Sequence, residues 1–261
     1  MYAKIFLIVS LLLNSCMQNA ADERDVALLS SEPNGVNNPV NPYQKIEEIP
    51  LPAGYKRISF SQVGFATWLR KLPLKKDKLV YLYNGVLKSN QAAQFAVLDI
   101  PVGKKDLQQC ADAVMRLRAT FQFDQQAYDK IFFRDNERRA YRFTVPHTRK
   151  NLDVFLERVF QRCGSASLEK QLHKKSLEQI RPGDVLIRGG FPGHVVMVMD
   201  LAENARGEKV FMLAQSYMPA QDIHVLLNPG SEKNSPWYPL TDAAHILTPE
   251  YHFRNTELRG W

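Results

Sequence analysis

The stretch from Gly189 to Tyr217, GGFPGHVVMVMDLAENARGEKVFMLAQSY, decides the fold of this sequence. Two apolar runs flank a loop at residues 201–208, a pattern that is typical of a β-hairpin. Each run is apolar on both faces, so we expect two interior strands of a sheet. His194 opens the first run and Gln215 closes the second. The hairpin therefore predicts that these two polar side chains lie together at its open end.

We expect Asp200 to face Lys209 across this hairpin, because opposite charges on facing strands attract. The same register pairs His194 with Gln215. An amide oxygen can accept an imidazole N–H and thereby determine which ring nitrogen stays free, the role of the third residue in nucleophile–histidine sites. The alternative is that His194 is simply a satisfied polar residue at a strand end.

Cys110 is the candidate nucleophile that would complete such a site. It lies in the segment 103–123, GKKDLQQCADAVMRLRATFQF, where Asp106 and Gln109 form a capping-box pattern at the start of a helix. In the first turn, free backbone N–H groups and the helix dipole favour a thiolate, and two preceding lysines add positive charge.

Two other roles stay open for Cys110, since it also lies on the apolar face of its own helix. It can pack in the core, or it can form a disulfide with Cys163, which an export compartment permits. Cys163 ends the apolar stripe of a second predicted helix, NLDVFLERVFQRCG at residues 151–164, where the dipole disfavours a thiolate. We therefore expect Cys163 to be a core residue.

Three further residues near Gln215 are candidates for the same site. His224 either approaches it or turns to solvent as an ordinary strand residue. Ser216 and Tyr217 could donate hydrogen bonds to a substrate. Asp184 and Asp200 are expected to be structural, in a turn and in the charge pair.

Composition and motifs exclude several classes of protein. The 261 residues carry 34 basic and 27 acidic side chains, a net charge of +7 without a basic cluster, which argues against nucleic-acid binding. The mean hydropathy of −0.31 argues against a polytopic membrane protein. The six histidines and three cysteines show no metal-ligating spacing, and there is no dinucleotide, P-loop or serine-hydrolase motif. We expect neither a metal nor a cofactor.

The first sixteen residues, MYAKIFLIVSLLLNSC, form a charged start and a short apolar run, as a signal peptide does. Residues 13–16, Leu-Asn-Ser-Cys, resemble a bacterial lipobox. This resemblance implies cleavage before Cys16, lipidation of Cys16 and anchorage in a membrane; Met17 implies the outer membrane, facing the periplasm. The alternative is an ordinary secretory signal.

The remaining chain divides into two parts. Residues 16–50 are rich in Asn, Pro and Ser and predict a flexible tether after a signal peptide at 1–15. Residues 51–261 predict a single domain. Its expected elements include a short helix after Ser59 or Ser61, a hairpin around Asn84-Gly85 and a loop-rich tail from 228 to 261. We expect an α+β fold: a small, mostly antiparallel sheet or half-barrel with helices packed on one side.

The stretch GDVLIRGGFPGHVVMVMD, at residues 183–200, together with a cysteine at a helix start, resembles the papain-like cell-wall peptidases of the NlpC type. The resemblance implies a papain-like, NlpC-like fold with Cys110 as nucleophile, His194 as base and Gln215 as orienting residue. It also implies peptidoglycan peptides as substrate. The cysteine context QQCADAV departs from the Asp-Cys-Ser-Gly pattern of that family.

The chain as a whole, from WLRKLPLK at 68–75 to SPWYPL at 235–240, is similar to a family of bacterial lipoproteins, domain of unknown function 4846. That likeness implies no particular activity. Two functions are expected from the sequence. One is a thiol hydrolase or acyltransferase of the cell envelope. The other is a non-catalytic envelope-binding or scaffolding lipoprotein that keeps the fold.

Overall fold

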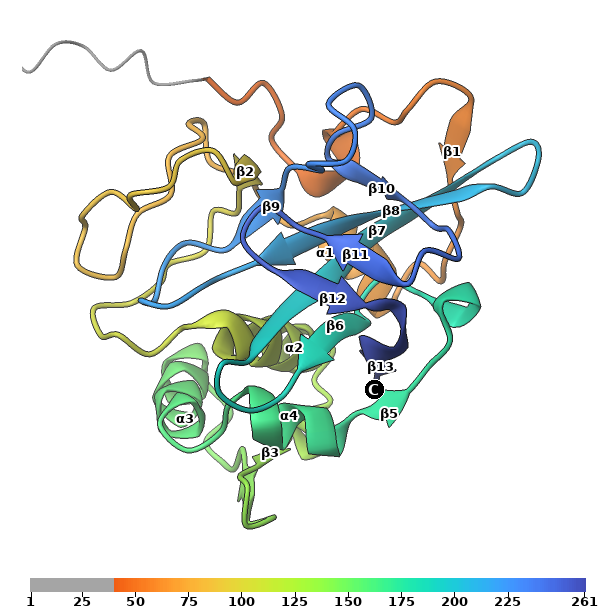
Figure 1. The fold of residues 1–261 in the computed structure, drawn as a ribbon. Helices are drawn as coiled ribbons and strands as arrows, with labels where there is room; N and C mark the ends of the chain where they lie inside the picture. Colours follow the sequence, from red (N-terminus) through yellow and green to blue (C-terminus); the bar gives the residue numbers. More distant parts are fainter. Residues whose placement is uncertain (1–39) are drawn as a thin grey trace, which may run out of the picture. The chain divides into compact units, whose positions relative to one another are not determined.

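A nine-stranded antiparallel sheet is the centre of the computed structural model, which describes residues 40–261 (Figure 1). Seven of its strands follow one another across the sheet in the order β2 (Gln94–Val97), β9 (His224–Leu226), β8 (Lys209–Gln215), β7 (His194–Asn204), β6 (Val185–Arg188), β13 (Leu258–Gly260) and β5 (His173–Lys174). The other two, β1 (Tyr55–Arg57) and β10 (Trp237–Pro239), pair with β7 and β8.

The two longest strands, β7 and β8, each have two short partners placed end to end along one edge. The start of β7 pairs with β6, and its last three residues pair with β1. The end of β8 pairs with β9, and its middle pairs with β10. Because every edge of the central hairpin is paired in this way, its backbone groups are satisfied although it is buried.

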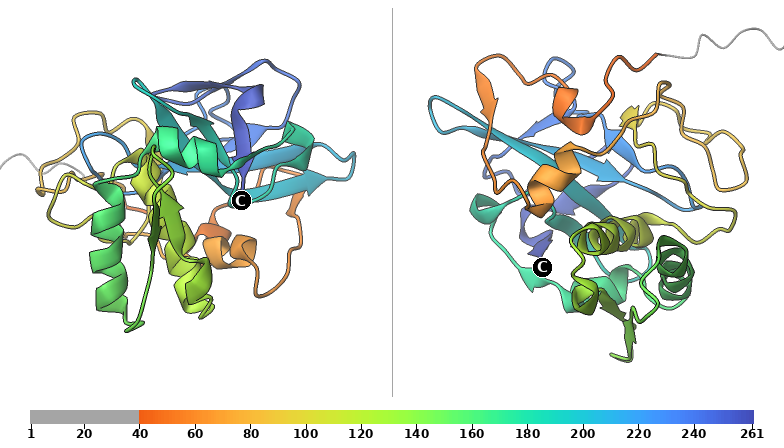
Figure 2. Two further views of the ribbon diagram at one scale, coloured as in Figure 1. Left: turned by 90° about the horizontal axis from the view of Figure 1, so that it is seen from below. Right: turned by 180° about the vertical axis from the view of Figure 1, so that it is seen from behind.

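Four α-helices lie within the described part of the chain: α1 (Phe65–Arg70), α2 (Cys110–Asp124), α3 (Arg149–Phe160) and α4 (Ser165–Gln171). Helices α1 and α2 contact β7, α4 contacts β6, and α3 packs on α2. Seen from behind, α1 and α2 lie in front of the sheet (Figure 2). None of the helices in residues 40–261 has the length and apolar character needed to cross a bilayer.

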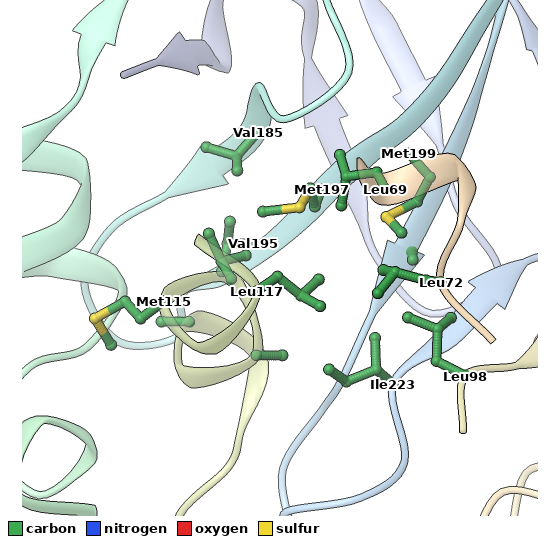
Figure 3. Packing of buried hydrophobic residues seen from close by; sticks show 14 of the residues in the cluster. Leu69, Leu72, Leu98, Met115, Leu117, Val185, Val195, Met197, Met199 and Ile223 are labelled. Carbon is green, nitrogen blue, oxygen red and sulfur yellow. The ribbon is translucent and has the colours of Figure 1, made fainter. Parts of the chain in front are cut away.

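Alternate residues of β7 enter two different hydrophobic cores. Val195, Met197 and Met199 pack against the helices, together with Leu69 and Leu117 (Figure 3). Val196 and Val198 face the other way and pack with residues of the C-terminal segment, including Tyr238, Phe253 and Leu258. The central strand is thus buried on both faces, as its sequence predicts.

Two small hairpins and four short 3-10 helices complete the described fold. Strands β3 (Phe132–Arg134) and β4 (Ala140–Arg142) form one hairpin, and β11 (His245–Leu247) and β12 (His252–Arg254) form the other. The 3-10 helices are η1 (Ile46–Glu48), η2 (Tyr128–Lys130), η3 (Leu177–Gln179) and η4 (Asn255–Glu257). The second hairpin lies over the face of the sheet that is opposite α1 and α2 (Figure 1).

The predicted fold class is wrong. The papain-like, NlpC-like fold with a small sheet or half-barrel and helices on one side is replaced by a large, open, mostly antiparallel sheet with few helices. The difference arises in the segments that were expected to be loops. The tail from 228 to 261 supplies four strands, β10 to β13, each of only three residues. Such short strands carry too little alternation to be recognised from sequence.

The predicted register of the central hairpin is also wrong. Met197 pairs with Ala214 and Val198 with Leu213, after which a bulge shifts the pairing so that Glu203 faces Lys209. The loop is therefore shorter than expected. Near the open end the shift from the predicted register is two residues, an even number, so every side chain there keeps its face of the sheet.

The structure matches one of the other predicted segments and departs from two. The stripe of α3 is confirmed, since Leu152, Phe155, Leu156, Val159 and Phe160 are buried. Helix α1 begins at Phe65 with Gly64 as its N-cap, later than either serine expected to cap it. The boundary placed at residue 51 falls inside the described fold, because Ile46 and Ile49 are fully buried in the helix-side core. The predicted signal peptide, Cys16 and the tether up to residue 39 lie outside the described residues.

Asp200 is the buried charge that connects the N-terminal segment to the sheet. Its carboxylate accepts hydrogen bonds from Nε of Arg57 and Nε of Arg70, both at 2.7 Å, and from the backbone N–H of Leu201. Asp200 itself has no exposed surface. The predicted partner, Lys209, instead lies 3.9 Å from Glu203 at the surface. Asp200 is therefore structural, as expected, but with different partners.

Replacing Asp200 by asparagine leaves Arg57 and Arg70 without their buried counter-charge. We expect this change to lower the free energy of unfolding by about 3–5 kcal/mol, the usual cost of breaking a buried ion pair. The matched surface variant Lys209→Met should cost less than about 1 kcal/mol. Urea denaturation of both variants measures the difference. Equal losses in the two variants would contradict this assignment of partners.

Candidate functional site

A cavity of about 430 Å³ opens where β7 begins, β8 has just ended and α2 begins. Cys110 and His194 both line it, and so do Cys163 and Tyr217. Its walls are otherwise largely apolar or glycine, with Leu107, Phe160, Gly190, Phe191, Pro192, Gly193 and Met218 among them. The structure thus brings the two central candidates of the sequence together although they are far apart along the chain.

Cys110 is the first residue of α2, but the cap is not the predicted one. Gln109 is the N-cap, and its backbone N–H donates to Oδ2 of Asp112 at 3.0 Å. Asp106 lies upstream and accepts from the backbone N–H of Ala220. Cys110 is half-buried and packs against the helix-side core. It therefore lies at a helix start, as predicted, and also packs against the core, one of the roles that the sequence left open.

The loop before His194 reaches the cavity through a close backbone approach. A side chain at Gly193 would place its first carbon 2.4 Å from the carbonyl oxygen of Gly190 and 2.7 Å from Oγ of Ser165, so only glycine fits there. Phe191 in the same loop is 92% exposed, and Met218 across the cavity is 55% exposed. Two large apolar side chains that line the cavity are thus exposed to solvent.

His194 is almost completely buried, with 1% of its surface exposed. Its ring packs against Tyr217, Tyr251 and Phe253, with centroid distances of 4.5, 5.1 and 6.0 Å. These contacts lie on the face of the sheet opposite α2. The cavity therefore joins side chains from both faces of the sheet at the strand ends, and His194 is one of the residues that line it.

Gln215 holds one nitrogen of this ring. Its Oε1 lies 2.7 Å from Nε2 of His194. Gln215 and His194 are not directly opposite in the register, but they are diagonal neighbours on the same face, which a long side chain can bridge. The predicted His194–Gln215 contact is present, although the pairing that motivated it is not.

The tautomer of His194 can be derived from the hydrogen bond that the NH₂ group of Gln215 makes. The Gln215 Nε2 atom donates to Oε2 of Glu250 at 2.8 Å, and a carboxylate can only accept. Oε1 must therefore face His194, where it accepts the proton of Nε2. Nδ1 of His194 is then the nitrogen free to take up a proton.

His224 belongs to this network and does not turn to solvent. It is fully buried, its Nδ1 lies 3.0 Å from the carbonyl oxygen of Asp222, and its Nε2 lies 3.4 Å from Nε2 of Gln215. Tyr217 lines the cavity, whereas the Ser216 hydroxyl lies 2.9 Å from the carbonyl oxygens of Gln108 and Gln221. Ser216 is thus structural. Asp184 also is, since it accepts the backbone N–H of Arg181 in the turn before β6.

The electrostatics of Cys110 differ from the expected activation. Burial, followed by the charge of Asp112, raises the pKa of the thiol to about 11. Hydrogen bonds from the backbone N–H groups of Val195, Ala111 and Cys110 oppose this rise but are smaller. The preceding lysines do not contribute; Lys105 pairs with Glu157. Cys110 is therefore a neutral thiol at neutral pH, surrounded by amide donors that would stabilise negative charge.

His194 is likewise neutral at rest. Burial lowers its pKa to about 4, although the hydrogen bond to Gln215 and the charge of Glu250 act in the other direction. A neutral imidazole can accept a proton at Nδ1, which is what a general base requires. Thiol and imidazole thus form an uncharged pair, and a charge separation would arise only during a reaction.

Cys163 and Cys110 are both free thiols, so the disulfide left open by the sequence is absent. Cys163 is 7% exposed, and burial raises its pKa to about 12. It is a core residue that touches the cavity, as expected. Within residues 40–261 no cluster of histidine, cysteine and carboxylate side chains could hold a metal ion.

Sequence reasoning missed the outer part of this site. Glu250 accepts a hydrogen bond from Gln215, and Lys88 and Asn90 donate to Glu250. No sequence motif connects these segments with Gln215, and only the folded chain brings them together. His224 could be named as a candidate from the sequence only because it follows Gln215 closely along the chain.

The raised pKa of Cys110 predicts how its alkylation depends on pH. Because the thiolate reacts, the rate with a small neutral alkylating reagent should rise about tenfold per pH unit between pH 7 and 10. The rate is measured by mass spectrometry of the peptide that carries Cys110, with free cysteine as reference. A plateau below pH 8 would mean a standing thiolate and would contradict the assignment.

The comparisons with known proteins identify a family but no activity. No curated protein and no solved structure matches the chain. The sequence does match the family described as Domain of unknown function (4846), over residues 46–145 and 135–260. These two matches cover nearly all of the described residues, the cavity included. The protein belongs to the family Domain of unknown function (4846).

Proposed function

We propose that this protein is a thiol hydrolase or acyltransferase of the cell envelope in which Cys110 is the nucleophile, His194 the general base and Gln215 the orienting residue. The observation that carries the proposal is the shared cavity: a helix-start thiol and a histidine with its tautomer determined by hydrogen bonds line the same space. The proposal concerns the chemistry of these side chains and does not rest on a papain-like fold.

The reaction would proceed from an uncharged resting pair. Nδ1 of His194 takes the thiol proton as the sulfur of Cys110 attacks a carbonyl carbon, and the same proton then passes to the leaving amine. Water or an acceptor amine then attacks the resulting thioester; its proton goes to Nδ1 and passes from there to the sulfur of Cys110 as the C–S bond breaks, which restores the neutral thiol and imidazole. The N–H groups of Cys110, Ala111 and Val195 are the donors available to the oxyanion.

The lining of the cavity supports a peptide as the acyl donor. No lysine or arginine lines it among the described residues, whereas Asp106 and Asp112 do. The amide, apolar or amino-bearing part of a substrate would thus meet the thiol, and its carboxylates would lie outside. The exposed Phe191 and Met218 offer apolar contact to a longer chain. Peptidoglycan peptides meet these requirements and are the substrate class that we propose.

The location in the envelope is part of the proposal and comes from the sequence. The lipobox-like residues 13–16 would provide a lipid anchor on Cys16, in the outer membrane facing the periplasm, and so hold the domain near peptidoglycan. These residues lie outside the described part of the chain.

One observation favours the second candidate, a non-catalytic envelope-binding or scaffolding lipoprotein. Burial raises the pKa of Cys110 and lowers the pKa of His194, so neither group is charged at rest. A cavity that only binds peptides needs no ionised thiol or imidazole. The exposed apolar side chains of Phe191 and Met218 would contact a bound peptide in the same way. The two functions differ in whether any bond is broken.

Incubation of the protein with purified peptidoglycan peptides, followed by mass spectrometry of the products, tests the proposal. We expect amide cleavage or transfer in the wild type and a loss of about a thousandfold or more in Cys110→Ala, because removing a nucleophile leaves only residual catalysis. Cys163→Ala is the matched control: it removes the other thiol of the cavity and should still cleave or transfer, because Cys163 forms no bond to the substrate. Full activity in Cys110→Ala would contradict the proposal, and peptide binding without cleavage in the wild type would favour the second candidate.

A further inference from the structure

Glu250 lies outside the cavity but at the centre of the polar network behind it. It belongs to the turn between β11 and β12, and its side chain is only 15% exposed. Oε2 accepts from Nζ of Lys88 at 2.6 Å and from Nε2 of Gln215 at 2.8 Å, and Oε1 accepts from Nδ2 of Asn90 at 2.9 Å. Three donors from two segments that are far apart in sequence therefore converge on one carboxylate.

Lys88 keeps this carboxylate charged. The lysine is 8% exposed, so its ammonium has little water and depends on Glu250 for its counter-charge. Burial alone would raise the pKa of Glu250, but the hydrogen bond and charge of Lys88, with Asn90, outweigh it and leave the pKa below its usual value. Glu250 is thus a permanent acceptor toward Gln215.

This acceptor decides the orientation of an amide that could otherwise point either way. Reversing the Gln215 side chain would place its carbonyl oxygen against a carboxylate and its NH₂ group against His194. The nearby His224 supports the same orientation, because its Nε2 accepts the second amide proton at 3.4 Å when Nδ1 donates to the carbonyl oxygen of Asp222. The carboxylate at 2.8 Å is the closer and stronger of the two acceptors.

We propose that Glu250 is a positioning residue of the site, which acts through Gln215 to keep His194 protonated at Nε2 and free at Nδ1. The inference rests on the proposed function for its purpose, since a general base needs one ring nitrogen free to take up a proton. The alternative is a merely structural role, in which the Glu250–Lys88 pair joins two surface segments and has no influence on the ring.

Nuclear magnetic resonance of the histidine ring nitrogens separates these roles. Spectra are recorded near pH 7.5, where the ring is neutral, and His194→Gln identifies the His194 signals. We expect the wild type to show protonated Nε2 and unprotonated Nδ1. Glu250→Met removes the acceptor, and we expect the signals of a single tautomer to be lost as the Gln215 amide reorients. Glu250→Gln keeps an acceptor oxygen and should restore the wild-type pattern.

In the Glu250→Met variant the buried ammonium of Lys88 has no counter-charge, which destabilises the fold. The double variant Lys88→Met/Glu250→Met, which removes both charges, is therefore measured beside it. We expect it to fold and still to lose the single tautomer. A folded Met variant with the wild-type pattern would overturn the proposal. So would a wild-type His194 protonated at Nδ1, a result that needs no Glu250 variant to fold.

The tautomer measurement also separates this inference from the proposed function. If no peptide is cleaved but the tautomer depends on Glu250 as described, the thiol chemistry fails and the positioning role stands. If peptides are cleaved and Glu250→Met keeps both the tautomer and the cleavage rate, the positioning role fails alone.

Discussion

The burial of β7 on both faces is the constraint on which the rest of the structure depends. Val195, Met197 and Met199 require a helical layer on one side, and Val196 and Val198 require a second apolar layer on the other. Since buried backbone groups must also be paired, both edges of this eleven-residue strand need partners, and β6, β1 and β8 supply them. His194 is the first residue of this strand, so its position is determined by the pairing and burial of β7, and the cavity that it lines lies where β7 begins.

Burial also determines the character of the site. In a region of low dielectric, charged groups are costly, so the thiol of Cys110 and the imidazole of His194 are neutral. The charged pair of Lys88 and Glu250 lies outside the cavity, next to Gln215. Buried polar groups need hydrogen-bond partners, and Lys88, Glu250, Gln215 and His194 are joined by a continuous chain of hydrogen bonds that leaves only Nδ1 of His194 free. The arrangement suits a reaction in which charge appears only in the transition state, stabilised by preorganised N–H groups.

Much of the site, but less of the fold, could be predicted from the sequence. The His194–Gln215 contact was found despite a wrong register, because a shift of two residues preserves the faces of a sheet and leaves diagonal neighbours in reach. The position of Cys110 in the first turn of a helix was predicted, but from a capping box at Asp106 and Gln109 that is replaced by one at Gln109 and Asp112. The strands of the tail, the partners of Asp200 and the role of Glu250 could not be found, because each depends on contacts between segments far apart in sequence. The raised pKa of Cys110 was missed since dipole and lysine arguments omit burial, the largest cause.

The central claim is that the sulfur of Cys110 becomes covalently acylated with help from His194. Acid quenching of the protein during turnover of a peptide substrate, followed by mass spectrometry of its fragments, tests this most directly. The account predicts an acyl group bound as a thioester at Cys110 in the wild type and its absence when His194 is replaced by glutamine. An acyl group on Cys163, or substrate turnover with no modified cysteine, would contradict it.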